Sequence, residues 1–259
     1  MSLNVVRYVD INADLGESFG HWTLGDDAAL VKFISSANVA CGLHAGDPAV
    51  IDETVARCKA AGVAVGAQPG FPDLQGFGRR ALAMSPREIE QSALYQIGAL
   101  AGFCAAHGVP LTHVKPHGAL YNIAAADGQV ARAIARGVAR FRPGLALVGL
   151  AGSSAFAEAA SAAGLAFISE AFADRRYLPD GTLQPREVPG SLIDDPTEAA
   201  AQALSIVTTG SAPAIDGTLV PVVARTICFH GDTPGAPAIV AAARARLEDA
   251  GVVIRAFAS

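Results

Sequence analysis

Residues 33–60, FISSANVACGLHAGDPAVIDETVARCKA, contain in one stretch the three parts that decide the fold. The apolar run from Phe33 to Val39 predicts a buried strand. The polar, glycine-containing segment after it predicts a loop at the carboxyl end of that strand. Asp47 followed by Pro48 predicts the N-cap and the first residue of a helix that reaches Ala60. The stretch is therefore expected to form a strand, a polar loop and a helix, in that order.

The same order recurs along the chain. Further strands are predicted at residues 5–11, 63–67, 111–115, 145–150, 166–169, 226–229 and 252–256, and further helices at residues 86–106, 127–139, 153–163, 196–207 and 237–250. Such alternation implies parallel strands joined by crossover helices. A chain of 259 residues has the size of a closed barrel.

We therefore predict an α/β fold, a TIM-like (β/α) barrel of seven or eight strands, with residues 1–259 in a single catalytic domain. A doubly wound open sheet is the alternative. Its Rossmann version is disfavoured, because no G-x-G-x-x-G follows the first strand.

Composition excludes several classes of protein. Hydrophobic residues make up 51% of the chain, but no uninterrupted apolar run is long enough to span a membrane, and no secretory signal is visible. The net charge is −5 with both signs interspersed, so no basic face for nucleic acid is expected. The four cysteines are far apart and predict reduced thiols, which favours a cytoplasmic protein.

Polar side chains gather where the predicted strands end. The carboxyl ends of parallel barrel strands share one rim, where catalytic groups from several strands converge. We therefore predict an active site on this rim, formed by residues from six loops: Asn12, Asp14, Glu17, Asn38, His44, Gln68, Arg79, Lys115, His117, Glu170, Arg175, His230 and Asp232.

Several of these residues also have purely structural interpretations. Asp14 and Glu17 suit a helix N-terminus, and His44 suits a turn. Lys115 is harder to explain in this way, because an unpaired buried charge is costly and the residue ends an apolar strand. It must face solvent or be paired in a cleft, so Lys115 together with His117 is the strongest catalytic candidate.

Six sequence blocks resemble the signature blocks of the LamB/YcsF family. They are DINADLGESFG (10–20), ANVACGLHAGDP (37–48), GAQPGFPDLQGFGRR (66–80), HVKPHGALYN (113–122), EAFADRRY (170–177) and CFHGDTPGA (228–236). The resemblance implies a barrel of the glycoside hydrolase/deacetylase type. It also implies ATP-dependent hydrolytic opening of 5-oxo-L-proline to L-glutamate, with ATP as co-substrate and with partner subunits B and C.

The residues suggest roles in such a reaction. Asp14 or Glu17 is a candidate base, and His117 or His44 a candidate proton donor. Lys115 and Arg79 are candidates to stabilise negative charge. Amide side chains of Asn12, Asn38 and Gln68 are candidates to orient the lactam, and the substrate-binding set is completed by Glu170, Arg175, His230 and Asp232. The chain has no P-loop, so its sequence does not place ATP.

Other functions remain open at this stage. Asp14, His44 and His117 are candidate ligands of a divalent metal, as in a metal-dependent deacetylase or amidohydrolase that needs no ATP. A non-catalytic subunit that binds a small carboxylate is a further alternative. The sequence also leaves a homo-oligomer open.

Overall fold

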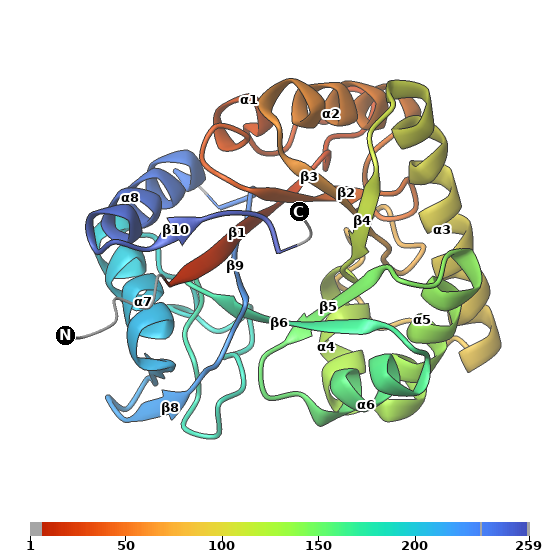
Figure 1. Cartoon of the computed structure of the whole chain (residues 1–259). Coiled ribbons are helices and arrows are strands. Elements are labelled where there is room, and N and C mark those ends of the chain that lie inside the picture. The colour runs from red at the N-terminus through yellow and green to blue at the C-terminus, as the bar shows by residue number, and fades with distance from the viewer. Residues whose placement is uncertain (1–6, 234, 258–259) are drawn as a thin grey trace.

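Seven parallel strands form a closed barrel in the structure, a computed structural model that describes residues 7–233 and 235–257 (Figure 1). β9 pairs with both β6 and β1, which closes the sheet on itself. The predicted TIM-like barrel is therefore confirmed, with seven strands. In barrel order these are β1 (Tyr8–Leu15), β2 (Ser36–Ala40), β3 (Ala64–Gln68), β4 (Leu111–Val114), β5 (Ala146–Leu150), β6 (Ala166–Phe172) and β9 (Thr226–Phe229).

Helices surround the barrel, as Figure 1 shows. They are α1 (Asp27–Leu30), α2 (Pro48–Ala61), α3 (Pro86–His107), α4 (Gly118–Ala126), α5 (Gly128–Phe141), α6 (Ser154–Ala162), α7 (Pro196–Thr209) and α8 (Ala236–Asp249). Three begin as their sequences predict, with proline at the first position after a capping side chain from Asp47, Ser85 or Asp195. Within the described part of the chain, no helix is both long and apolar enough to cross a membrane.

The longest barrel strands extend further than their apolar runs predict. β1 begins at Tyr8 and continues past Ile11 to Leu15, while residues 5 and 6 of the predicted strand lie outside the described residues. The physical reason is alternation of the side chains across the strand. Val9, Ile11, Ala13 and Leu15 pack in the apolar core, whereas Asp10, Asn12 and Asp14 make polar contacts across the barrel. β6 extends to Phe172 and includes Glu170.

The remaining strands lie outside the barrel. β10 (Val253–Ile254), at the strand predicted for residues 252–256, pairs only with Tyr8 and Val9 at the amino end of β1. β7 (Ser211–Pro213) and β8 (Leu219–Pro221) form a separate antiparallel pair. Phe257, beyond β10, packs edge-on against the ring of His113 inside the barrel.

A buried carboxyl group lies near the amino ends of the strands. Asp10 is 1% exposed and accepts hydrogen bonds from Ser35 Oγ at 2.6 Å, Ser36 Oγ at 2.7 Å and the hydroxyl of Thr226. Burial raises the pKa of Asp10 to about 6, even though the three hydroxyls oppose the rise. The folded protein thus holds a proton on Asp10 at a pH at which the unfolded chain has released it.

This proton makes stability depend on pH. Because the unfolded chain loses the Asp10 proton near the ordinary pKa of 3.8, the Asp10 contribution should fall as pH rises to about 6 and then stay level. Asp10→Asn cannot ionise. We expect the unfolding free energy of the wild type, relative to this variant, to fall by roughly 2–3 kcal/mol between about pH 4 and pH 7 in urea titrations. If the unfolding free energies of the two proteins change with pH in parallel, Asp10 is not the source of this pH dependence.

Candidate active site

Lys115 lies directly after β4 and is the charged centre of the rim. It is 3% exposed, and its Nζ lies 3.0 Å from Asp14 Oδ1, 2.9 Å from Glu170 Oε1 and 2.9 Å from Cys228 Sγ. Burial disfavours the ammonium, but the neighbouring carboxylates outweigh burial and hold the pKa of Lys115 well above its ordinary value. The sequence left two alternatives for Lys115, exposure to solvent or pairing in a cleft. The structure shows that it is paired in a cleft.

A network of inward-facing side chains supports this ion cluster from below. Asn38 Nδ2 donates to Asn12 Oδ1 at 2.7 Å and to Asp14 Oδ1 at 2.9 Å. Asn12 Nδ2 donates to Glu170 Oε1 at 3.1 Å. His113 Nε2 lies 3.0 Å from Asn38 Oδ1, and burial lowers the pKa of His113 to about 3, so its ring is neutral. The amides therefore fix the carboxylates that hold Lys115.

The cluster faces a cavity of about 510 Å³ on the carboxyl side of the barrel. This volume suits a small polar molecule. The ring of Phe172 forms part of the wall, and Lys115 Nζ lies 5.6 Å from the centre of that ring. Six of the residues predicted from the sequence line the cavity: Asp14, Arg79, Lys115, His117, Arg175 and His230.

A second group lies beside the cavity and consists of Glu17, His44 and His117. The two imidazole rings stack with centroids 4.0 Å apart, and His117 Nδ1 lies 3.6 Å from Glu17 Oε1. His117 Nε2 donates to the carbonyl of Phe77 at 2.9 Å. Burial lowers the pKa of His117 to about 3 and that of His44 well below its ordinary value. Both rings are therefore neutral.

The carboxyl group of Glu17 behaves in the opposite way. Burial, followed by the charges of Asp14 and Asp232, raises the pKa of Glu17 well above its ordinary value. Among the described residues, Glu17 Oε1, both ring nitrogens of His44 and both amide atoms of Gln68 are buried without a hydrogen-bond partner. A protonated Glu17 here is a potential proton donor.

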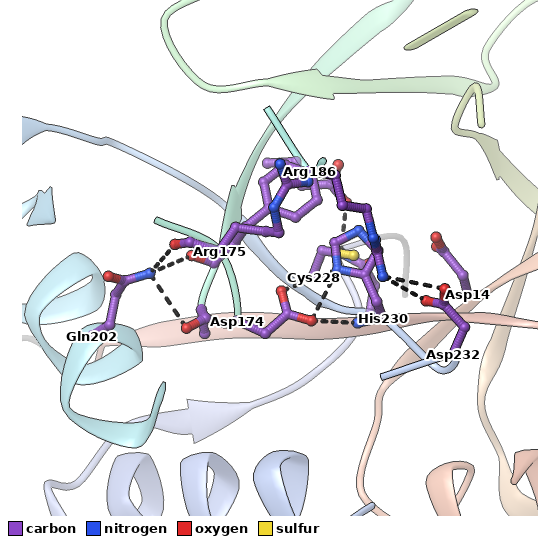
Figure 2. Close-up of polar contacts among 12 residues, drawn as sticks. Asp14, Asp174, Arg175, Arg186, Gln202, Cys228, His230 and Asp232 are labelled. Carbon is purple, nitrogen blue, oxygen red and sulfur yellow. Dashed lines mark hydrogen bonds and ion pairs between the residues drawn. The ribbon is translucent and has the colours of Figure 1, made fainter. Parts of the chain in front are cut away.

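His230 and Asp174 form a third group, shown in Figure 2. Asp174 lies two residues after β6 and is 1% exposed. Its carboxylate accepts from the backbone N–H of His230 at 2.8 Å, and its Oδ2 lies 2.9 Å from His230 Nδ1. Burial raises the pKa of Asp174, but His230 outweighs it and the net shift is downward. Asp174 is absent from the residues predicted from the sequence.

Arginines form the side of the cavity nearest the loop between β6 and α7. Arg79 Nη2 lies 2.7 Å from Asp232 Oδ2. Arg186 Nη2 lies 3.0 Å from Asp232 Oδ1 (Figure 2). Asp232 therefore holds two cations that line the cavity and does not itself line it. Arg175 is 7% exposed and donates to the carbonyl of Gln184 at 2.6 Å, while its Nε has no partner among the described residues.

Among residues 7–233 and 235–257, two groups contain the right residue types for a metal ion, Asp14–Cys228–His230 and Glu17–His44–His117. In the first, the Lys115 ammonium lies 3.0 Å from Asp14 and 2.9 Å from Cys228, so a cation already occupies this place. In the second, the imidazole planes are 9° from parallel, whereas a metal accepts each imidazole lone pair in the plane of its ring. One ion cannot lie in the planes of two imidazole rings that are stacked and nearly parallel, so the second group does not fit a metal. Neither group therefore fits a metal.

The structure separates the remaining predicted residues into layers. Asn12, Asn38 and Glu170 lie below the cavity, and Glu17, His44 and Gln68 are buried beside it. The sequence interpretation missed Cys228 and Arg186 as well as Asp174. Cys228 lies within β9, in register with Asn12, and alternation would have revealed its inward direction. Arg186 carries no comparable signal, because it lies in a long loop.

A closed barrel whose strand ends gather a buried lysine, carboxylates and histidines around a cavity has the features of a (β/α)-barrel enzyme. The chain belongs to the LamB/YcsF family, whose sequence profile matches residues 9–259. Family membership confirms the resemblance seen in the six sequence blocks.

Similar proteins carry consistent names. A protein of Chloroflexus aggregans, named as the A subunit of 5-oxoprolinase, is 58% identical over 247 residues, which are 95% of this chain and 98% of the relative. A Thermus thermophilus protein of the same name is 55% identical over 96% of this chain and 99% of its own. The crystal structure of a lactam utilization protein from Thermus thermophilus superposes with a TM-score of 0.91 at 54% identity, covering 96% of this chain and all of that one.

Proposed function

We propose that the chain is the A subunit of a 5-oxoprolinase and that it catalyses hydrolytic ring opening of 5-oxo-L-proline to L-glutamate in an ATP-dependent reaction with partner subunits B and C. The observation that carries the proposal is the buried Lys115 cation, which lies between Asp14 and Glu170 and faces the cavity. The names of the relatives point to the same substrate.

The chemistry of a lactam explains the need for such a lysine. A lactam is a resonance-stabilised amide, so attack by water requires a base, and the developing negative oxygen requires a positive partner. ATP activates the lactam oxygen, by phosphorylation or otherwise, and ends as ADP and inorganic phosphate when glutamate is released. Lys115 stabilises the charge that develops on that oxygen. In this role Asp14 and Glu170 hold the ammonium in place, because both are already paired with it.

The leaving nitrogen needs a proton. Glu17 suits this step, because burial and neighbouring carboxylates raise the pKa of its carboxyl group and so favour the protonated form. His117 lines the cavity, and its Nδ1 lies 3.6 Å from Glu17 Oε1. The Nε2–H of His117 leaves the Phe77 carbonyl and gives its proton to the leaving nitrogen, while Nδ1 takes the proton of Glu17. Glu17 thus acts as an acid, and not as the base for which the sequence made it a candidate.

The carboxylate of 5-oxoproline needs a cation that is not already neutralised. Arg175 suits this role, because it lines the cavity and its Nε has no partner among the described residues. Arg79 and Arg186 each share Asp232, which leaves them less free to bind a second anion. A guanidinium binds a carboxylate through two parallel hydrogen bonds, which also orients the ring.

We further propose that the reaction on this chain needs no resident metal. The support is the Lys115 ammonium in one candidate group and the nearly parallel rings in the other. Elemental analysis of the purified chain by mass spectrometry is expected to find zinc, iron, manganese and nickel each well below one ion per chain. Stoichiometric metal that is lost in a His44→Ala variant would overturn this expectation.

The proposal treats the barrel as a single catalytic domain of a cytoplasmic enzyme, consistent with four cysteines that are all buried free thiols. Its decisive test is glutamate release from 5-oxo-L-proline by this chain mixed with subunits B and C of a relative, with and without ATP. ATP-dependent release that requires this chain supports the proposal. Absence of release, or release of acetate from acetylated amines without ATP, would reject it.

A further inference from the structure

We propose that His230 is the base that activates the attacking water and that Asp174 is the positioning residue that fixes the tautomer of His230. The inference rests on the proposed function, since it assigns the base of that reaction. In the step, the water oxygen bonds to the lactam carbon while one water proton moves to His230 Nε2. The electron pair of the breaking C–N bond stays on the ring nitrogen, which takes its proton from the Glu17–His117 side.

The hydrogen bonds of Asp174 decide which nitrogen of His230 is free. An ionised carboxylate only accepts hydrogen bonds. Asp174 accepts the backbone N–H of His230, so its second bond, from Nδ1 at 2.9 Å, requires a proton on Nδ1. The lone pair of the neutral ring is then on Nε2. The same logic of a buried carboxylate behind an imidazole orients the base in serine proteases.

Packing fixes the direction of the ring. The Phe172 ring stacks on His230 with centroids 5.5 Å apart and planes 16° from parallel. His230 lines the cavity, and one of its ring nitrogens lies within 4.8 Å of both an Asp14 carboxylate oxygen and Cys228 Sγ. Asp14 and Cys228 both contact Lys115 Nζ. The base is thus close to the cation that stabilises the developing charge, as attack on one carbon requires.

The other buried histidines lack this combination of features. His117 Nε2 is bound to the carbonyl of Phe77. His113 lies beneath the cavity and contacts Asn38 and Thr112 through its two nitrogens. His44 does not line the cavity. His230 alone among these four lines the cavity and also has a carboxylate within hydrogen-bonding distance of Nδ1, since the Glu17 oxygen lies 3.6 Å from Nδ1 of His117.

The test compares Asp174→Asn with wild type in the complex with subunits B and C. In wild type, Asp174 Oδ2 accepts the backbone N–H of His230 and lies 2.9 Å from Nδ1, while Oδ1 lies 3.1 Å from Nδ1. In Asp174→Asn the carboxylate charge is lost, and the NH₂ group that replaces Oδ1 competes for the lone pair of Nδ1. The change therefore shifts the ring toward the tautomer with its proton on Nε2, which cannot accept a proton from water. We expect kcat to fall about 10²–10⁴-fold while KM changes little.

Asp195→Asn is the matched control. Asp195 caps α7 by accepting from Glu198 N–H, and asparagine caps helices equally well. Glutamate release by this variant should equal that of wild type. The double variant Asp174→Asn/His230→Gln should lose no more activity than His230→Gln alone, because both changes remove one base. Additive losses would indicate a merely structural role for Asp174.

Nitrogen-15 NMR of the chain alone gives a readout that does not depend on the reaction. Neutral His230 should carry its proton on Nδ1 in wild type and on Nε2 in Asp174→Asn. An unprotonated Nδ1 in wild type, or unchanged kcat in Asp174→Asn, overturns the inference. If the wild-type complex releases no glutamate, the proposed function is rejected. The NMR experiment would still determine the tautomer of His230.

Discussion

Replacement of Lys115 by methionine is expected to abolish glutamate release by the complex, with kcat lower by at least about 10²–10³-fold. Methionine has a similar length but no charge. It therefore removes the cation that stabilises the developing oxyanion and leaves the cavity shape nearly intact. Stopped assays of glutamate, with and without ATP, measure the effect. Retention of more than about a tenth of the wild-type rate would show that the charge of Lys115 does not act on the reacting oxygen.

The same substitution should also destabilise the fold. Asp14 and Glu170 are 6% and 0% exposed, and removal of their shared cation leaves two carboxylates buried without it. Breaking a buried ion pair on one side costs roughly 3–5 kcal/mol, less where the carboxylates can take up protons. Urea unfolding near neutral pH measures this cost. Lys32→Met, at an exposed lysine, is the control and should change stability by less than about 0.5 kcal/mol.

Of the variants that add a single methyl group, Gly66→Ala is expected to have the largest effect on the free energy of unfolding. Gly66 lies in β3 in register with Asn38 and His113, and a β-carbon there would overlap the His113 ring. The ring cannot easily move away, because its nitrogens contact Thr112 Oγ1 at 2.8 Å and Asn38 Oδ1 at 3.0 Å. We expect a loss of about 3 kcal/mol or more in urea unfolding, from overpacking and from the broken hydrogen bond.

The control is Gly102→Ala in α3. Gly102 is exposed and helical, and a β-carbon there meets no atom within 4 Å. Alanine should stabilise the helix by about 0.5–1 kcal/mol. The two variants add the same methyl group and should shift stability in opposite directions. Equal destabilisation by both would mean that the contact with His113 does not limit position 66.

Local sequence signals were sufficient for most of the architecture. Proline after Asp47, Ser85 and Asp195 marked the starts of three helices, because these residue types satisfy helix N–H groups wherever they occur. Strand ends were harder to predict. β1 and β6 were ended too early because Asp14 and Glu170 are polar, although both are buried inside the barrel. The end of a strand cannot be predicted from the end of its apolar run where the face of the strand inside the barrel is polar.

The rim could be predicted for a related reason. Each polar loop follows its own strand, and the parallel barrel brings all these ends to one side, so membership of the site needs no knowledge of contacts. The assignment of roles did need contacts. Asp14 is held by Lys115 and Asn38, which makes it a support more than a base, while Asp174 turns His230 from a candidate for substrate binding into a proton acceptor.

The sequence determined which residue types stand at the strand ends, that strands and helices alternate along the chain and which family the chain resembles. The closure of the barrel decided the pairings. Lys115 meets Glu170 and Cys228 only because β4, β6 and β9 face the same interior, although these residues are 55 and 113 positions away from it in the chain. Local propensities carry no information about such separations. Charge pairing, tautomers and shifted pKa values depend on distances of a few ångströms, which only the folded barrel sets.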